Sequence, residues 1–244
     1  MDFPRPLRPK ERDLLEFILP VDRPGYRAIR GEVERMLVIG EGRRGQGNFV
    51  LGEAGQEPDF SYALRPVIAY GMVEATADSY GITVREPFEG QIDVEIVSRA
   101  GGEVPDHFEE KRRWTYSEWS PGSVSPGTGE PVREVAVDAA RTLAIAAGER
   151  RLWIHDRASG MVLPIPVTNF YNELMLTKQI RDPAIALRSQ LLFESHRSHT
   201  DADLRAAFVA YNAVRRRVDV DPAPQAPRRA GLSGLVHTLF RKRR

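Results

Sequence analysis

The sequence predicts an α+β protein that ends in a flexible C-terminal tail. Apolar residues recur with helical spacing near the N-terminus, alternate with a period of two over much of residues 36–98, and return to helical spacing beyond residue 168. Helices and strands are therefore segregated along the chain, which disfavours a parallel βαβ sheet. A length of 244 residues suffices for one large domain or for two small ones.

The first predicted domain, residues 1–98, combines two helices with antiparallel strands. Apolar spacing predicts a helix over 11–19, which Pro20 ends, and a second helix over 24–37. Strands are expected where apolar runs or alternating patterns are bounded by turn residues. These segments are 36–39, 48–51, 66–77, 82–85 and 91–98.

The second predicted domain, residues 107–217, is a strand-hairpin unit followed by helices. Segments 111–119 and 132–137 are expected to pair as strands, and the alanine-rich segment 138–147 predicts a short helix that Asp138 caps. A hairpin is predicted from the strands 151–155 and 161–167. Helical spacing then predicts three helices, over 169–180, 183–196 and 201–217.

The C-terminal segment combines a spacer with a basic amphipathic pattern. Three prolines within residues 218–230 predict a stiff, extended linker. In residues 231–244, apolar side chains recur at i, i+3, i+4, i+7 and i+8, which is one stripe of an α-helix, and four basic residues follow. The stripe is Leu232, Leu235, Val236, Leu239 and Phe240, and the basic run is Arg241, Lys242, Arg243 and Arg244.

Charge is distributed unevenly between the body and this tail. The whole chain carries 35 Lys and Arg against 34 Asp and Glu, and its last 27 residues hold six basic side chains and two acidic ones. The preceding 217 residues therefore hold 29 basic and 32 acidic side chains, so the body is about −3 and the tail about +4. A separate basic helix of this kind predicts docking on a surface rather than burial in the body.

Composition excludes several classes of function. The chain has no cysteine, which rules out disulfides, thiolate nucleophiles and cysteine-ligated zinc. It shows no signal-peptide pattern at the N-terminus and no run of 18 apolar residues. We therefore expect a soluble, cytoplasmic protein with no metal and no cofactor, and the tail would allow it to associate with a membrane.

A glycine-rich segment, residues 40–47, matches the pattern G-x-G-x-x-G. A dinucleotide site also requires a helix that starts there and an acidic residue about 20 positions later. A strand pattern follows instead, and position 65 is arginine. The segment is therefore predicted to be a flexible hairpin tip. A weaker alternative is that Arg43 and Arg44 bind an anion.

One cluster of candidate metal ligands lies between His196 and Asp203. His196 and His199, with Asp201 and Asp203, offer nitrogen and oxygen ligands that suit Zn²⁺ or Mn²⁺. Helix capping already explains the carboxylates, because Thr200 or Asp201 can accept hydrogen bonds from the first N–H groups of the following helix, and early carboxylates complement its positive end. Capping is the preferred interpretation.

The segment Lys111–Trp119 interleaves basic residues with aromatic rings, a mixture that single-stranded nucleic-acid binders use. Three glutamates, Glu109, Glu110 and Glu118, dilute its positive charge. A strand whose aromatic rings pack in the core is the preferred interpretation.

No catalytic motif emerges, so the favoured hypothesis is a non-catalytic adaptor. Its basic amphipathic C-terminal helix would dock on a partner protein or on the inner membrane surface. One alternative is a nucleic-acid-binding protein that uses the tail and Lys111–Trp119. Another is a metal- or phosphate-dependent enzyme with a site near His196–Asp203.

Overall fold

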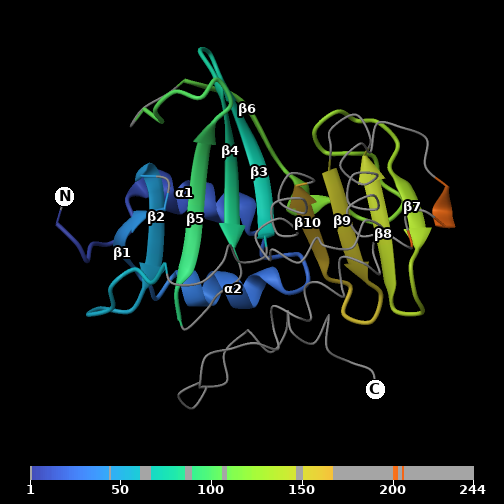
Figure 1. The fold of residues 1–244 in the computed structure, drawn as a ribbon, viewed down its shortest axis with the longest axis horizontal. Helices are drawn as coiled ribbons and strands as arrows, with labels where there is room; N and C mark the ends of the chain where they lie inside the picture. Colours follow the sequence, from blue (N-terminus) through green and yellow to red (C-terminus); the bar gives the residue numbers. More distant parts are fainter. Residues whose placement is uncertain are drawn as a thin grey trace, which may run out of the picture. The chain divides into compact units, whose positions relative to one another are not determined.

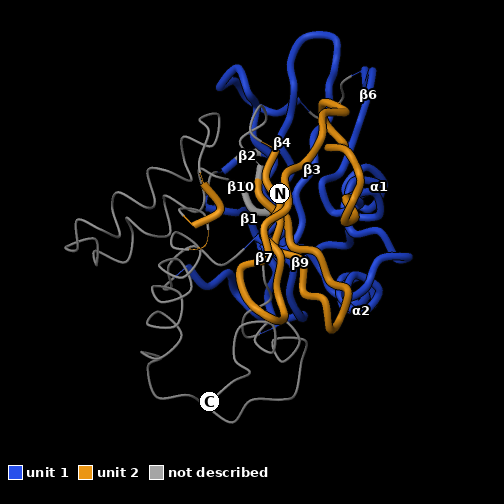
Figure 2. Tube along the Cα trace, turned by 90° about the vertical axis from the view of Figure 1, so that its right-hand side faces the viewer, with its two compact units in different colours: residues 1–118 blue, residues 119–244 orange. Residues whose placement is uncertain are grey.

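The structure is a computed structural model that describes residues 2–43, 45–60, 67–85, 90–105, 109–146, 151–166, 200–202 and 205. Within these residues the chain forms two antiparallel sheets, with ten strands in all, and two short α-helices (Figure 1). The predicted α+β class, a two-helix strand unit followed by a hairpin and helical unit, is therefore wrong, because most of the described structure is sheet. The chain divides into two compact units, residues 1–118 and 119–244 (Figure 2).

The first unit contains a six-stranded antiparallel sheet in the order β1-β2-β5-β4-β3-β6, with two helices. Figure 2 shows both helices on the same side of this sheet. The elements are α1 (Pro9–Ile18), α2 (Tyr26–Val33), β1 (Leu37–Gly42), β2 (Gly45–Gly52), β3 (Val67–Ala75), β4 (Ser79–Arg85), β5 (Ile92–Ser98), β6 (Glu110–Thr115) and the 3₁₀ turn η1 (Tyr116–Glu118).

Both predicted N-terminal helices are confirmed, with slightly different ends. In α1 the buried side chains Leu14, Leu15 and Ile18 form one stripe, and the backbone N–H of Arg8 donates to the Glu11 carboxylate at 2.8 Å, which satisfies the first turn. The second helix ends at Val33, before the predicted limit, because the chain turns and enters β1 at Leu37.

Gly71 of β3 has no side chain, which lets α1 pack closely on the centre of the sheet. A Cβ atom on Gly71 of β3 would lie 3.4 Å from Phe17 and 3.5 Å from Ile18, both in α1. Successive strand residues point to opposite faces, so Tyr70 and Met72 lie on the face away from the helices. There the Tyr70 hydroxyl approaches Gly81 of β4, which also has no side chain to obstruct it.

The second unit contains a four-stranded antiparallel sheet in the order β10-β9-β8-β7. The predicted hairpin is confirmed as β9 and β10, which pair from Val162↔His155 to Pro166↔Arg151. Trp119 and Trp153 stack in this unit with ring centroids 5.2 Å apart. The strands are β7 (Arg133–Ala136), β8 (Arg141–Ala146), β9 (Arg151–Asp156) and β10 (Val162–Pro166).

The predicted helix over 138–147 is wrong, because residues 141–146 form strand β8. This strand pairs on both sides, with Leu143 opposite Val135 of β7 and opposite Ile154 of β9. Backbone pairing with two neighbours and the burial of Leu143 and Ile145 outweigh the helical preference of the five alanines in segment 138–147. Asp138 caps a turn instead of a helix.

The predicted pairing of segments 111–119 and 132–137 is also wrong. The first segment becomes β6 only as far as Thr115 and pairs with β3, from Gly71↔Thr115 to Ala75↔Glu110. The second segment becomes β7 and pairs with β8. Pairing between distant strands depends on the topology of the whole sheet, which local alternation does not report.

The predicted helices over 169–180 and 183–196, and the tail, lie outside the described residues. In the predicted helix 201–217, the described residues Asp201, Ala202 and Arg205 have helical backbone. No helix in the described ranges is both long and apolar enough to cross a membrane.

A hydrogen bond from α2 stabilises an irregular point in β3. The Tyr26 hydroxyl, which is fully buried, donates to the backbone carbonyl of Ile68 at 2.7 Å. Ile68 is the residue where the register between β3 and β4 shifts, so the regular ladder is interrupted there. Burial raises the pKa of Tyr26, so its hydroxyl stays protonated and keeps donating in mildly alkaline solution.

We therefore expect Tyr26→Phe to lower the free energy of unfolding by about 1–2 kcal/mol, because the buried carbonyl loses its donor while the ring packing is retained. Urea denaturation followed by circular dichroism measures the change. An unchanged midpoint and slope would show that the Ile68 carbonyl does not depend on this hydroxyl.

Candidate functional site

Most of the residues that the sequence predicts to form a docking, anion-binding or metal site lie outside the described residues. This holds for the whole predicted tail helix, residues 231–244, and for Arg44, His196, His199 and Asp203. Arg43, Asp201 and the segment Lys111–Trp119 are described, so their surroundings can be compared with the predicted roles.

The glycine-rich segment forms the tip of the β1–β2 hairpin. Pairing ends at Gly42↔Gly45, and β2 follows directly, so no helix begins where a dinucleotide site requires one. Gly45 and Gly47 have φ values of 75° and 85°, which glycine adopts at little cost. The Arg43 guanidinium lies 5.1 Å from the centroid of the Phe60 ring, in a cation–π contact. The tip therefore directs Arg43 toward an aromatic ring of its own unit.

The Asp201 carboxylate lies between two arginines. It accepts a hydrogen bond from Arg133 of β7 and lies 3.9 Å from the Arg205 guanidinium. Arg205 also donates to the backbone carbonyl of Ala136 at 2.8 Å. A metal ion at Asp201 would have to displace Arg133 and approach two positive charges, so these contacts disfavour the predicted metal role of this residue. They attach the start of the helical segment to β7.

The segment Lys111–Trp119 does not present its aromatic rings together. Tyr116 and Trp119 are buried, at 3% and 2% exposure; Tyr116 packs at a tilt against the Tyr70 ring, and Trp119 stacks on the Trp153 ring. Only Trp114 is partly exposed, and the Arg112 guanidinium lies 4.7 Å from its ring centroid. Two of the three rings that a nucleic acid would need for stacking are therefore inaccessible.

A buried ion pair on the helix-free face of the first sheet was missed by sequence reasoning. Arg85 of β4 and Glu95 of β5 are 1% and 6% exposed, and Nη2 of Arg85 lies 2.9 Å from Oε2 of Glu95. Thr83, which lies directly opposite Glu95, and Asp93, two residues along β5, are also buried. The alternation of polar and apolar residues in these strands predicts a solvated face, and nothing in the pattern distinguishes this from a buried polar one.

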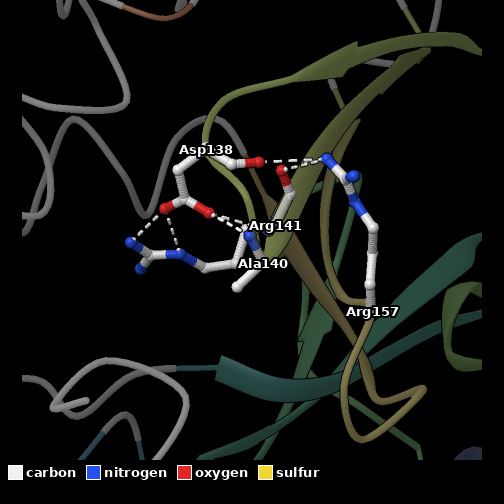
Figure 3. A network of polar contacts seen from close by, with 4 residues as sticks. All are labelled: Asp138, Ala140, Arg141 and Arg157. Carbon is white, nitrogen blue, oxygen red and sulfur yellow. Dashed lines mark hydrogen bonds and ion pairs between the residues drawn. The ribbon is translucent and has the colours of Figure 1, made fainter. Parts of the chain in front are cut away.

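A second polar network joins two turns of the second sheet (Figure 3). The Asp138 carboxylate accepts hydrogen bonds from the backbone N–H groups of Ala140 and Arg141, both at 2.8 Å, and from Nε of Arg141 at 2.8 Å. The Arg157 guanidinium, from the β9–β10 turn, donates to the carbonyls of Asp138 and Arg141 at 3.0 and 3.2 Å. All of these groups bind one another, so the network holds the two turns together.

No group of three His, Cys, Asp or Glu side chains placed to hold a metal ion is present in the described part of the chain. Comparison with protein-family models, with curated proteins and with solved structures finds no match to this chain. The functional argument therefore rests on the residues themselves.

The buried ion pair generates a stability prediction. We expect Arg85→Met to lower the free energy of unfolding by about 3–5 kcal/mol, because the Glu95 carboxylate then stays buried without its cation. The matched control is Arg27→Met on α2, where the exposed arginine is expected to change stability by less than about 0.5 kcal/mol. Chemical denaturation of both variants makes the comparison, and equal losses would contradict a special role for the pair.

The Asp138 network predicts a dependence on pH. Burial raises the pKa of Asp138, but the hydrogen bonds from Arg141 and from the backbone of Ala140 outweigh it and hold the pKa below 3.8. A carboxylate with a lowered pKa stabilises the fold above its ordinary pKa, and this contribution is lost as the pH falls toward the folded-state pKa.

Asp138→Asn should therefore cost about 1 kcal/mol near pH 7, a modest value because the carboxylate is more than one-third exposed. The difference from the unmodified chain should shrink as the pH falls below about 4. Thermal unfolding at several pH values measures it, with Asp22→Asn at an exposed position as the control. A difference that persists unchanged at acidic pH would show that the Asp138 charge is not its source.

Proposed function

We propose that the protein is a non-catalytic adaptor whose basic C-terminal segment, residues 231–244, docks on a partner protein or on the inner membrane surface. The observation that carries the proposal is the segregation of charge together with the apolar stripe. Residues 222–244 contain six basic side chains and no acidic one, so their charge is not neutralised within the segment.

The energetics of such a segment favour reversible binding. A helix of ten to fifteen residues is marginal in water, so it is expected to fold when its apolar stripe meets a surface. Each basic residue near an anionic membrane contributes about 1 kcal/mol, and partly buried apolar side chains add to this. Ordering the backbone opposes the gain by about 1–2 kcal/mol per residue. The expected net affinity is therefore modest.

The contacts of the described body support a role as scaffold. Its prominent charged groups bind partners inside their own unit: Arg85 with Glu95, Arg113 with Asp13, and Arg141 with Asp138. These interactions hold strands, a helix and a turn in place. In this proposal the tail supplies the cationic surface that binds the partner.

The experiment compares five forms of the chain in co-sedimentation with vesicles that contain phosphatidylserine and with vesicles of phosphatidylcholine alone. One form is unmodified, one lacks residues 228–244, one carries Leu235→Ser and Leu239→Ser, and one replaces the four terminal basic residues with glutamine. The polar-face variant Ser233→Ala, Thr238→Ala is the matched control.

We expect the glutamine variant to lose at least about a hundredfold in affinity for anionic vesicles, and the stripe variant at least about tenfold. The control should bind like the unmodified chain. If the target is a protein, vesicles show no binding, and the same variants lower the yield of one specific partner in cross-linked pull-downs. Binding that survives removal of residues 228–244 in both assays would refute the proposal.

A further inference from the structure

The four edges of the two sheets are protected to different degrees. An edge strand carries unpaired N–H and C=O groups, which can accept an added strand unless something blocks them. At β1 the N-terminal segment blocks the edge, because Arg5 and Val38 exchange two backbone hydrogen bonds of 3.0 and 2.8 Å. At β10 the prolines Pro164 and Pro166 lack N–H groups.

The β7 edge is protected by a side chain, because the Arg205 guanidinium binds the carbonyl of Ala136. At β6 no described strand or segment fills the corresponding position, and residues Glu110–Arg113 are exposed. A bulge at Lys111, where the register with β3 shifts, and exposed charged side chains discourage unselective pairing at this edge, but neither fills the position of a further strand.

The inner side of β6 is firmly held, so the strand is a rigid template. Arg113 forms an ion pair of 2.7 Å with Asp13 of α1 and lies 4.8 Å from the ring centroid of Phe17. The backbone N–H of Thr76 donates to the carbonyl of Glu109 at 3.2 Å, which continues the pairing past the bulge. A preformed edge lowers the entropy that an incoming strand must lose.

The exposed charges at the bulge favour an acidic occupant. The Lys111 side chain is exposed and forms no ion pair or hydrogen bond within the described part of the chain. Arg112 is exposed as well, and its guanidinium is oriented by the Trp114 ring. The adjacent acids Glu109 and Glu110 are bound to Thr76 and Arg113, respectively.

We propose that the β6 edge binds an extended, acidic peptide of a partner protein by β-strand addition. Backbone hydrogen bonds would supply affinity, and carboxylates opposite Lys111 and Arg112 would supply specificity. Glu74, which lies opposite Arg112 on β3, limits the positive charge there and so favours a short acidic motif over a long polyanion. A second copy of the chain is disfavoured, since antiparallel pairing centred on these residues would bring lysine against arginine.

The test measures the binding of three fluorescein-labelled eight-residue peptides by fluorescence anisotropy. The first alternates valine or threonine with aspartate. The second has lysine in place of aspartate. The third keeps the aspartates but has proline at two alternating positions, which removes N–H donors without changing the charge. An unlabelled acidic peptide also reports through tryptophan emission, because Trp114 is the one partly exposed tryptophan of the three.

The variant Lys111→Glu, Arg112→Glu reverses the charge of the edge, and Arg27→Glu, Arg35→Glu makes the same change in net charge at exposed positions near α2. We expect the acidic peptide to bind the edge variant about tenfold more weakly, whereas the lysine peptide binds that variant better than it binds the unmodified chain. The control variant should bind like the unmodified chain.

Two outcomes would overturn the inference. The proline-containing peptide binding as tightly as the acidic one would show attraction by charge without strand pairing. Equal losses in the edge and control variants would show a general effect of net charge. The measurements are repeated on the full chain with glutamine at its four terminal basic residues, where binding should persist. This repeat distinguishes a loss of peptide binding at the β6 edge from a loss of the proposed docking by the tail.

Discussion

Backbone N–H and C=O groups that a sheet does not pair within its own ladder must find another partner, and this constraint organises much of the molecule. Tyr26 binds the carbonyl at the β3 irregularity, and the Asn48 side chain accepts from the N–H of Ile96 at 2.8 Å, next to the last pair of β2 and β5. Arg157 binds two carbonyls of the β7–β8 turn. Side chains far away in the sequence thus supply hydrogen-bond partners for backbone groups where strands bend or end.

Hydrophobic periodicity predicted the elements that depend on local burial and failed where distant partners decide the outcome. The N-terminal helices and the β9–β10 hairpin follow from such periodicity. Segment 138–147 has helical composition but becomes β8, because strands on both sides pair with it. The partner of β6 was missed for the same reason. The burial of Arg85 and Glu95 was missed because a buried polar face and a solvated one give the same alternation.

The candidate sites show a related limit. Sequence reasoning grouped residues by type and spacing, whereas the structure separates them by what they contact. The sequence of Lys111–Trp119 indicates one basic, aromatic segment. In the structure, however, Tyr116 and Trp119 are buried and contribute to packing, whereas Lys111 is exposed. The sequence suggests Asp201 as a metal ligand or a helix cap, whereas in the structure its carboxylate binds Arg133. The type of a residue shows which interactions its side chain can make, and the neighbouring residues determine whether those interactions are already made within the fold.

Net charge must be interpreted in the same way. The body has a slight excess of acid, but many of its arginines stabilise the fold through specific carboxylates, as Arg113 does with Asp13 across 100 positions of sequence. Such pairs are fixed by geometry and leave little charge for a partner. Residues 222–244 have no acidic side chain with which to form such a pair inside the segment. The two proposals therefore concern the basic residues of the tail, which lie outside the described residues, and Lys111 of β6. They differ in what supplies specificity: an apolar stripe in the first case and a rigid strand backbone in the second.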